Sequence, residues 1–319
     1  EKRLAKTEGK SRYDYGREAF LEKVFEWKDQ YQSRISNQMR RLGASFDFSR
    51  EAFTMDESRS AAVTENFCKL FEDGILYREN RLVNWCVYLN TTLSNLEVVQ
   101  KTLPGRTLMN VPGYPPNERI EFGVIVSFVY PVVGSDEKIV VATTRPEAIL
   151  GDTAVAVPPD DERYKHLHGK MLQHPFIPER QVPLVTDSIA VDMAFGTGAV
   201  KITPAHDPND YDVGKRHNLP FINILNDDGT LNANAGEFQG MKRFSARRAV
   251  VEALKAKGLY VETKDNPMVV PVCERSGDVI EPVMKPQWWV NCQPLAKAAV
   301  EKVQSDNMVI EPPQSKRCL

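Results

Sequence analysis

The hydrophobic pattern of this chain changes near residue 112, and the change limits the folds open to it. Upstream, apolar side chains recur at helical spacing over residues 17–42 and 57–73, which predicts two amphipathic helices, and a strand is expected at 81–86. Downstream, short alternating apolar runs separated by Gly, Pro and Asp predict a compact β-rich unit. Its expected strands cover residues 121–131, 138–144, 153–157, 189–193 and 198–203, with one later helix ending at Gly258.

These patterns predict a mixed α/β fold with more than one domain. Residues 1–111 form an expected α/β domain, residues 112–270 a β-rich, barrel-like domain with some helix, and residues 271–319 a return segment to the first domain. A length of 319 residues suits two domains better than one small core. Trp288 and Trp289 are expected to pack where the domains meet.

Composition narrows the setting. The net charge of −2 gives no overall basic field that would attract nucleic acid, although local basic clusters can still do so. No apolar run reaches the roughly 18 residues that a membrane span needs, so no membrane partner is expected. The five cysteines are scattered and odd in number, which indicates reduced thiols. We therefore expect a cytoplasmic location, with a mitochondrial one as the alternative.

The densest polar segment covers residues 195–210. Lys201 and Thr203 alternate with apolar residues, so they share one face of the expected strand. Asp207 is followed by proline, which predicts that Asp207 caps a helix whose first turn holds Asp210. All four side chains can then reach one cleft. The plainer interpretation is that Asp207 only caps the helix and that Asp210 only favours its dipole.

A glycine-flanked turn precedes this strand. Phe195, Gly196, Thr197 and Gly198 form it, and the two glycines allow the backbone to approach a ligand closely. A metal site is another alternative for the segment, because imidazole and carboxylate groups are ligands. Its candidate ligands are His166, His168, His206, Asp207 and Asp210. No known metal spacing is completed, so no metal is expected.

A second polar constellation lies where the strand expected at 138–144 ends. Thr143 and Thr144 are adjacent hydroxyls, and Arg145 follows them. One interpretation is an ordinary strand end with hydroxyl-to-backbone hydrogen bonds. The other is a small polar pocket whose arginine contacts a phosphate or a ribose edge.

Together the two constellations resemble the editing domain of the class I aminoacyl-tRNA synthetases for valine, isoleucine and leucine. The hallmarks are the Thr-Thr-Arg-Pro-Glu strand end and the block Gly-Thr-Gly-Ala-Val…Ala-His-Asp-x-x-Asp. Longer blocks, at 151–157, 160–164, 166–170 and 201–211, are most similar to the valine-specific members, and the resemblance covers nearly the whole chain. It implies part of a Rossmann-type catalytic domain with an inserted editing domain.

The resemblance also implies what the chain lacks. The family's ATP-site signatures His-Ile-Gly-His and Lys-Met-Ser-Lys-Ser do not occur in the sequence. We therefore expect a fragment that does not ligate valine, a reaction for which the full-length enzymes need ATP and magnesium. Editing itself needs no cofactor. The expected partner is the aminoacylated 3′ end of valine tRNA, and threonine is the amino acid removed.

The family assigns roles to the site residues. Asp207 is expected to contact the threonine hydroxyl and Asp210 its ammonium group, while Lys201, beside Thr203, contacts the terminal ribose or the developing oxyanion. Phe195 is expected to wall the threonine methyl. The side chains expected to border the terminal adenosine and hold a water are Thr143, Thr144 and Arg145. With no nucleophilic triad evident, direct attack by a positioned water is expected.

One position departs from the family pattern. Where the motif has a second threonine after Pro-Glu, this chain has Ala148, so one hydroxyl and one methyl are missing from the pocket rim. Ala148 motivates one alternative, an editing-impaired fragment that only binds tRNA, and an isoleucine- or leucine-type editing domain is a second alternative. A metal hydrolase is a third. The candidate tRNA contacts are Lys215, Arg216, Lys242, Arg243, Arg247 and Arg248.

Overall fold

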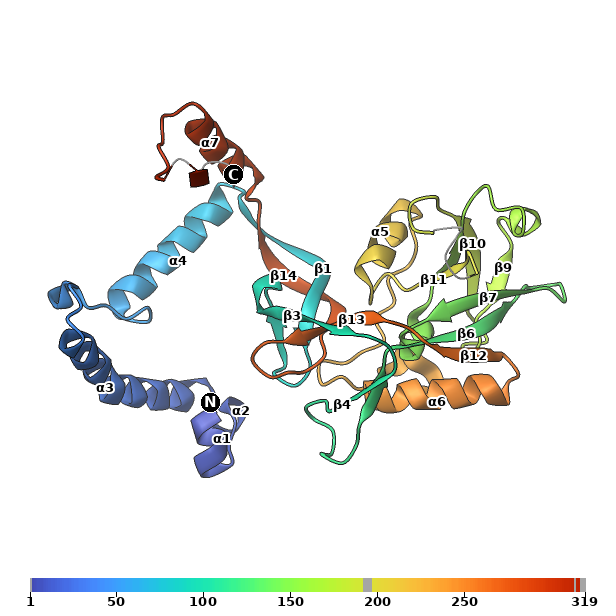
Figure 1. Cartoon of the computed structure of the whole chain (residues 1–319), viewed down its shortest axis with the longest axis horizontal. Helices are drawn as coiled ribbons and strands as arrows, with labels where there is room; N and C mark the ends of the chain where they lie inside the picture. Colours follow the sequence, from blue (N-terminus) through green and yellow to red (C-terminus); the bar gives the residue numbers. More distant parts are fainter. Residues whose placement is uncertain (1, 192–196, 313, 316–319) are drawn as a thin grey trace. The chain divides into compact units, whose positions relative to one another are not determined.

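A computed structural model describes residues 2–191, 197–312 and 314–315. The chain divides into two compact units, residues 1–76 and residues 77–319, which we describe separately (Figure 1). The predicted boundaries at 111/112 and 270/271 both lie inside the second unit and stay predictions. Within the described residues no helix is both long and apolar enough to cross a bilayer.

The first unit is helical. It holds α1 (Lys2–Glu8), α2 (Arg12–Tyr15), α3 (Arg17–Arg41), the short η1 (Phe48–Arg50) and α4 (Glu57–Glu72). Both predicted helices are confirmed. Asp56 caps α4 by accepting a hydrogen bond from the Arg59 backbone N–H, and Gly43 follows α3 with a φ of 79°, as expected of a residue that ends a helix.

The second unit begins with small sheets. Strand β1 (Leu76–Cys86) lies between β14 (Glu281–Val290) and β2 (Thr91–Leu93). The remaining strands here form two antiparallel pairs: β3 (Val98–Leu103) with β13 (Met268–Cys273), and β4 (Thr107–Met109) with β5 (Ile120–Phe122). Segments from the two ends of the unit are therefore hydrogen-bonded neighbours, which is why β14 can reach the site described below.

Two further sheets form the β-rich part. One has the order β12 (Tyr260–Asp265), β6 (Val124–Pro131), β7 (Lys138–Thr143). The other has the order β11 (Val200–Ile202), β8 (Ala154–Val157), β10 (Gln181–Thr186), β9 (Met171–Gln173), and β8 and β10 are parallel. The helices are α5 (Pro208–Arg216), α6 (Arg243–Ala256) and α7 (Gln293–Gln304), with the short turns η2 (Asn95–Glu97), η3 (Pro146–Gly151), η4 (Lys165–Leu167) and η5 (Ala233–Phe238). The predicted mixed α/β class is confirmed.

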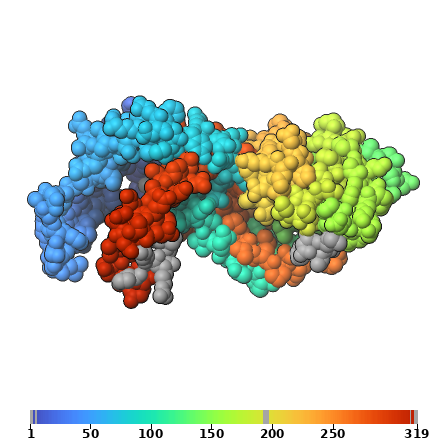
Figure 2. Space-filling view, turned by 90° about the horizontal axis from the view of Figure 1, so that it is seen from above, coloured from blue at the N-terminus to red at the C-terminus, as the bar shows by residue number. Residues whose placement is uncertain are grey.

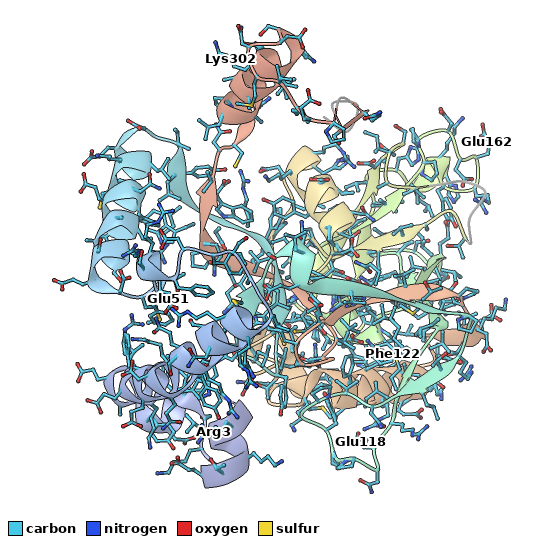
Figure 3. All side chains as sticks on the ribbon, turned by 60° about the vertical axis from the view of Figure 1, so that its left-hand side comes forward. Arg3, Glu51, Glu118, Phe122, Glu162 and Lys302 are labelled. Carbon is cyan, nitrogen blue, oxygen red and sulfur yellow. The ribbon has the colours of Figure 1, made fainter. Side chains whose placement is uncertain are left out.

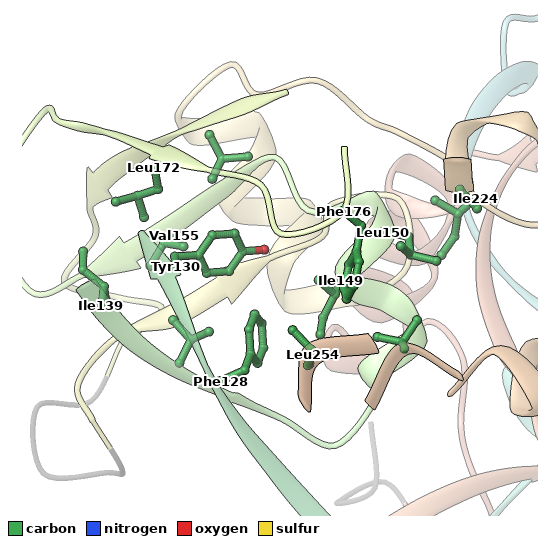
Figure 4. Close-up of a cluster of buried hydrophobic side chains, with 14 of the residues drawn as sticks. Phe128, Tyr130, Ile139, Ile149, Leu150, Val155, Leu172, Phe176, Ile224 and Leu254 are labelled. Carbon is green, nitrogen blue, oxygen red and sulfur yellow. The ribbon is translucent and has the colours of Figure 1, made fainter. Parts of the chain in front are cut away.

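The main hydrophobic core lies among β6, β7, β8 and η3. Phe128, Tyr130 and Ile139 are fully buried in it, and η3 contributes Ile149 and Leu150. Figure 4 shows the Tyr130 ring packed among these side chains, with its hydroxyl directed away from Ile139. That hydroxyl needs a buried polar partner, which the next subsection identifies.

Two strand predictions are wrong in detail. The strand predicted over 121–131 is two strands, because Gly123 has a φ of 74° and any Cβ there would collide with the Gly105 carbonyl. The strand predicted at 189–193 is a turn over residues 188–190, and residues 192 and 193 lie outside the described residues. The Trp289 indole donates to the Glu79 carbonyl and Trp288 is 47% exposed, and their expected place where domains meet stays a prediction.

Candidate functional site

The site is built where β11 passes into α5. Asp207 caps α5 as predicted: its Oδ1 accepts from the backbone N–H groups of Asn209 and Asp210, at 2.8 and 3.2 Å. The Thr203 N–H donates to Asp210 Oδ2 at 2.8 Å, which ties the end of the strand to the first turn of the helix. Figure 2 shows α5 and its flanking loops, in yellow, at the surface of the second unit.

Lys201 and Thr203 meet at a third carboxylate that the sequence analysis missed. Asp152 Oδ1 accepts from Lys201 Nζ at 3.2 Å and from Thr203 Oγ1 at 2.5 Å, and its Oδ2 accepts from the Tyr130 hydroxyl at 2.6 Å. Asp152 is fully buried. A charged residue inside the apolar stretch 149–157 was the available signal, because a buried carboxylate requires partners.

The electrostatics of this cluster, Lys201 with Asp152, Asp207 and Asp210, leave more carboxylates than cations. Burial raises the pKa of Asp210 to about 7, and the charge of Asp207 adds to the rise, against the lowering effects of Lys201 and the Thr203 N–H. Burial lowers the pKa of Lys201, but the carboxylates of Asp152, Asp210 and Asp207 outweigh burial and leave that pKa raised. Lys201 is thus charged; it is hydrogen-bonded to Asp152 and attracted electrostatically by Asp207 and Asp210.

The Thr143–Ala148 segment contacts the same region through Arg145. Arg145 Nη1 donates to the His206 carbonyl, the residue before Asp207, at 2.8 Å. The Thr143 hydroxyl accepts from the Arg145 N–H at 3.0 Å, so the strand-end interpretation holds for this threonine. Thr144 is half-buried, and Ala148 is only 4% exposed within η3. Contacts of Thr143, Thr144 and Arg145 with adenosine stay predictions.

The Arg145 guanidinium is also committed within the protein. Its Nη2 forms an ion pair with Glu281 on β14, and Glu147 lies 3.8 Å from its Nε. Any contact of Arg145 with a phosphate or a ribose would therefore compete with these carboxylates. The sequence analysis missed Glu281, which lies 136 residues away from Arg145 in the chain.

The described part of the glycine turn, Thr197 and Gly198, contacts the loop that holds Arg163 and Tyr164. Phe195 and Gly196 lie outside the described residues. Gly198 has a φ of 70°, and a Cβ there would collide with the Arg163 guanidinium, so a neighbouring side chain and not a ligand occupies that space. The Thr197 carbonyl accepts from the Tyr164 hydroxyl at 2.7 Å.

Two histidines of the metal alternative, His206 and His166, have other partners, whereas the buried His168 Nε2 has none among the described residues. His206 is buried; its Nε2 accepts from the Ile224 N–H at 3.0 Å, so its Nδ1 carries the proton donated to the Pro282 carbonyl at 3.2 Å. His166 belongs to η4, not to a strand, and pairs with Glu137. In the described part of the chain, no three His, Cys, Asp or Glu residues gather as metal ligands.

The basic residues predicted to contact tRNA differ in exposure: one is buried and others lie at the surface. Arg243 is 2% exposed and pairs with Asp278 and Glu281, so it cannot be the surface contact that the sequence suggested. Arg248 is exposed and pairs with Glu118, which Figure 3 places on the loop before β5. The exposed candidates that stay predictions are Lys215, Arg216, Lys242 and Arg248.

The fold and this site can now be set beside known proteins. Residues 1–318 match the family model for tRNA synthetases class I (I, L, M and V), and the chain belongs to this family. Its sequence is similar to the valine–tRNA ligases: it is 63% identical to the enzyme of Schizosaccharomyces pombe and 53% identical to that of Homo sapiens, over 99% of the chain in each case. It is 60% identical to the mitochondrial valine–tRNA ligase of Saccharomyces cerevisiae.

The predicted resemblance to the valine-specific members of class I is therefore confirmed. The chain covers 32% of the S. pombe enzyme, 28% of the S. cerevisiae enzyme and 25% of the human enzyme. It thus spans about a third or less of the length of these relatives.

Proposed function

We propose that the site at the start of α5 hydrolyses the ester of threonine mischarged onto valine tRNA. The observation that carries the proposal is the buried Asp210 beside Asp207, with the pKa of Asp210 raised to about 7. The ammonium group of an aminoacyl ester, placed against Asp210, would stabilise its ionised form. A cationic substrate therefore offsets the cost of burying this carboxylate.

Asp207 supplies the selectivity in this proposal. Both of its cap bonds end at Oδ1, so we assign Oδ2 as the oxygen that accepts a hydrogen bond from the substrate. Valine and threonine are near isosteres, and the apolar amino-acid pocket of valyl-tRNA synthetases prefers valine over threonine by only about a hundredfold. Valine lacks the hydroxyl and would leave a desolvated carboxylate oxygen unpaired, at a cost of about 1–3 kcal/mol.

The reaction is proposed to be direct hydrolysis. The oxygen of a positioned water bonds to the ester carbonyl carbon, and the ribose oxygen leaves and takes up a proton, giving free threonine and tRNA with a free 3′ end. Lys201, held by Asp152 and Thr203, is the cation proposed to face the developing oxyanion. No cofactor takes part; ATP and magnesium belong to the ligation reaction of the longer relatives.

The test is deacylation of threonyl-tRNA specific for valine by this chain. We expect hydrolysis, and a loss of at least about 100-fold in Asp210→Ala, because the ammonium contact orients the ester. Asp212→Ala is the matched control, since Asp212 is exposed on the same helix. Activity that survives Asp210→Ala would place the chemistry elsewhere.

Ala148 motivates a second candidate, a fragment that binds tRNA without editing it. Its buried methyl stands where the family motif has a threonine. Binding of valine tRNA with no hydrolysis of threonyl-tRNA would favour this candidate. Faster hydrolysis of mischarged isoleucine or leucine tRNA would instead indicate an isoleucine- or leucine-type site.

A further inference from the structure

We propose that Glu281, on β14, is a positioning residue for editing: through Arg145 it holds the backbone of His206 and so fixes Asp207. This inference rests on the proposed function, since it assigns the residue that orients the hydroxyl-reading carboxylate. It also links the pocket to the strand that follows the β-rich part of the unit.

The contacts form a short chain. Glu281 is 1% exposed, and its Oε2 accepts from Arg145 Nη2. The other terminal nitrogen of Arg145 donates to the His206 carbonyl at 2.8 Å. Asp207 is the next residue, and the peptide that Arg145 holds is the one that leads into the helix cap. One planar guanidinium thus bridges a buried carboxylate and the pocket backbone.

The next residue of β14 holds the same point from a second side. The Pro282 carbonyl accepts from His206 Nδ1 at 3.2 Å, while the Ile224 N–H donates to His206 Nε2 at 3.0 Å. His206 is therefore held at its carbonyl through Glu281 and at its ring by Pro282. Two successive residues of β14, together with the Thr203 contacts to His206 and Asp210, hold the point at which Asp207 begins α5.

Glu281 also keeps Arg145 away from the pocket carboxylates. Asp207 and Asp210 both act electrostatically on Arg145, so they compete with Glu281 for its charge. Without the Glu281 charge, Arg145 keeps Glu147, 3.8 Å from its Nε, but one carboxylate fewer opposes the attraction of Asp207 and Asp210, so the guanidinium competes with the substrate ammonium for them. Editing then loses both orientation and selectivity.

The first test is Glu281→Gln, which preserves shape and removes the charge. We expect the ratio of threonyl-tRNA to valyl-tRNA deacylation to fall about tenfold, because the hydroxyl contact is displaced. Glu262→Gln is the matched control, since Glu262 is a half-exposed glutamate on β12 with Lys264 as its partner. An unchanged ratio in Glu281→Gln overturns the proposal.

A double-mutant cycle with Arg145→Lys tests the route. Lysine keeps the charge but cannot bridge Glu281 and the His206 carbonyl, so Glu281→Gln should lower the ratio no further in that background. Additive losses would mean that Glu281 acts by another path and would overturn the proposal.

A measurement without activity separates this inference from the proposed function. We expect the amide resonances of Asn209 and Asp210, which report the Asp207 cap, to shift in Glu281→Gln and to stay in place in Glu262→Gln. A wild-type chain that does not hydrolyse threonyl-tRNA counts against the proposed function, while unshifted amides count against the positioning role.

Discussion

Two groups of buried charge lie close together in the second unit, and they are balanced differently. The arginine network joins three guanidinium groups to three carboxylates: Arg145, Arg243 and Arg247 with Glu147, Asp278 and Glu281. The pocket holds one ammonium group among three carboxylates: Lys201 with Asp152, Asp207 and Asp210. The first group has as many guanidinium groups as carboxylates, whereas the second has more carboxylates than ammonium groups, and in the proposed function the substrate ammonium joins it.

The pKa values of two buried acids express the same contrast. Burial raises the pKa of Glu147, but the charge and hydrogen bonds of Arg247 outweigh burial, and the net pKa is lowered. At Asp210 burial prevails and the pKa is about 7. Burial also raises the pKa of Asp278 in spite of Arg243, so the contrast is between Glu147, where arginine charge outweighs burial, and Asp210, where it does not and which is a candidate for binding.

The largest expected effect tests the balanced group. Arg243→Met should lower the free energy of unfolding by about 3–5 kcal/mol, because Asp278 and Glu281 lose a shared buried partner. Arg248→Met is the control and should cost at most about 1 kcal/mol, since Arg248 is 57% exposed and pairs with Glu118 at the surface. Urea unfolding measures both, and equal losses would remove the distinction between the network and a surface pair.

A smaller loss should follow when the pocket loses a neutral donor. Tyr130→Phe removes the 2.6 Å hydrogen bond to Asp152 and should lower the unfolding free energy by about 2 kcal/mol. Tyr260→Phe is the control, because its hydroxyl bonds to Thr263 in a partly exposed position. If the two variants lose the same amount, Asp152 does not depend on Tyr130.

Asp210→Asn should act in the opposite direction. The folded pKa of about 7 lies above the ordinary pKa of 3.8 for an aspartate, so the native state holds a proton that the unfolded state releases, and stability falls as pH rises between these values. Asparagine does not ionise, so the variant should be more stable than wild type by about 1–2 kcal/mol at pH 8. The gain should disappear toward pH 4. If the Asp210→Asn variant is less stable than wild type at pH 8, burial of the ionised Asp210 carboxylate does not destabilise the native state.

The smallest expected effect concerns Ala148. Ala148→Thr restores the family's hydroxyl and should change the ratio of threonyl-tRNA to valyl-tRNA deacylation by roughly threefold, within the effect of one contact. Ala142→Thr on β7 is the control, as it is half-buried and lies outside the motif. If both deacylation rates stay unchanged, position 148 has no part in the site.

Local chemistry explains what could be read from the sequence. The helix at 57–72 and its Asp56 cap, and the Asp207-Pro208 start of α5, each depend on residues within one turn of each other. Periodicity and capping are local, so they are visible in a single sequence. The wrongly predicted strand at 189–193 also has a local cause. The Asp187 side chain accepts hydrogen bonds from the Ile189 and Ala190 N–H groups and closes a turn, although the apolar residues there alternate as in a strand.

By itself, the sequence determined the mixed α/β class, the helix cap at Asp207 and the resemblance to valine-specific class I synthetases. Only the tertiary structure decided which charges are satisfied: that Asp152 holds Lys201 across 49 residues, that Arg243 is buried, and that Glu281 reaches Arg145 across 136 residues. The physical reason is that a charge is stabilised by whatever lies within a few ångströms of it, and strand pairing between distant segments, not spacing along the chain, sets those neighbours.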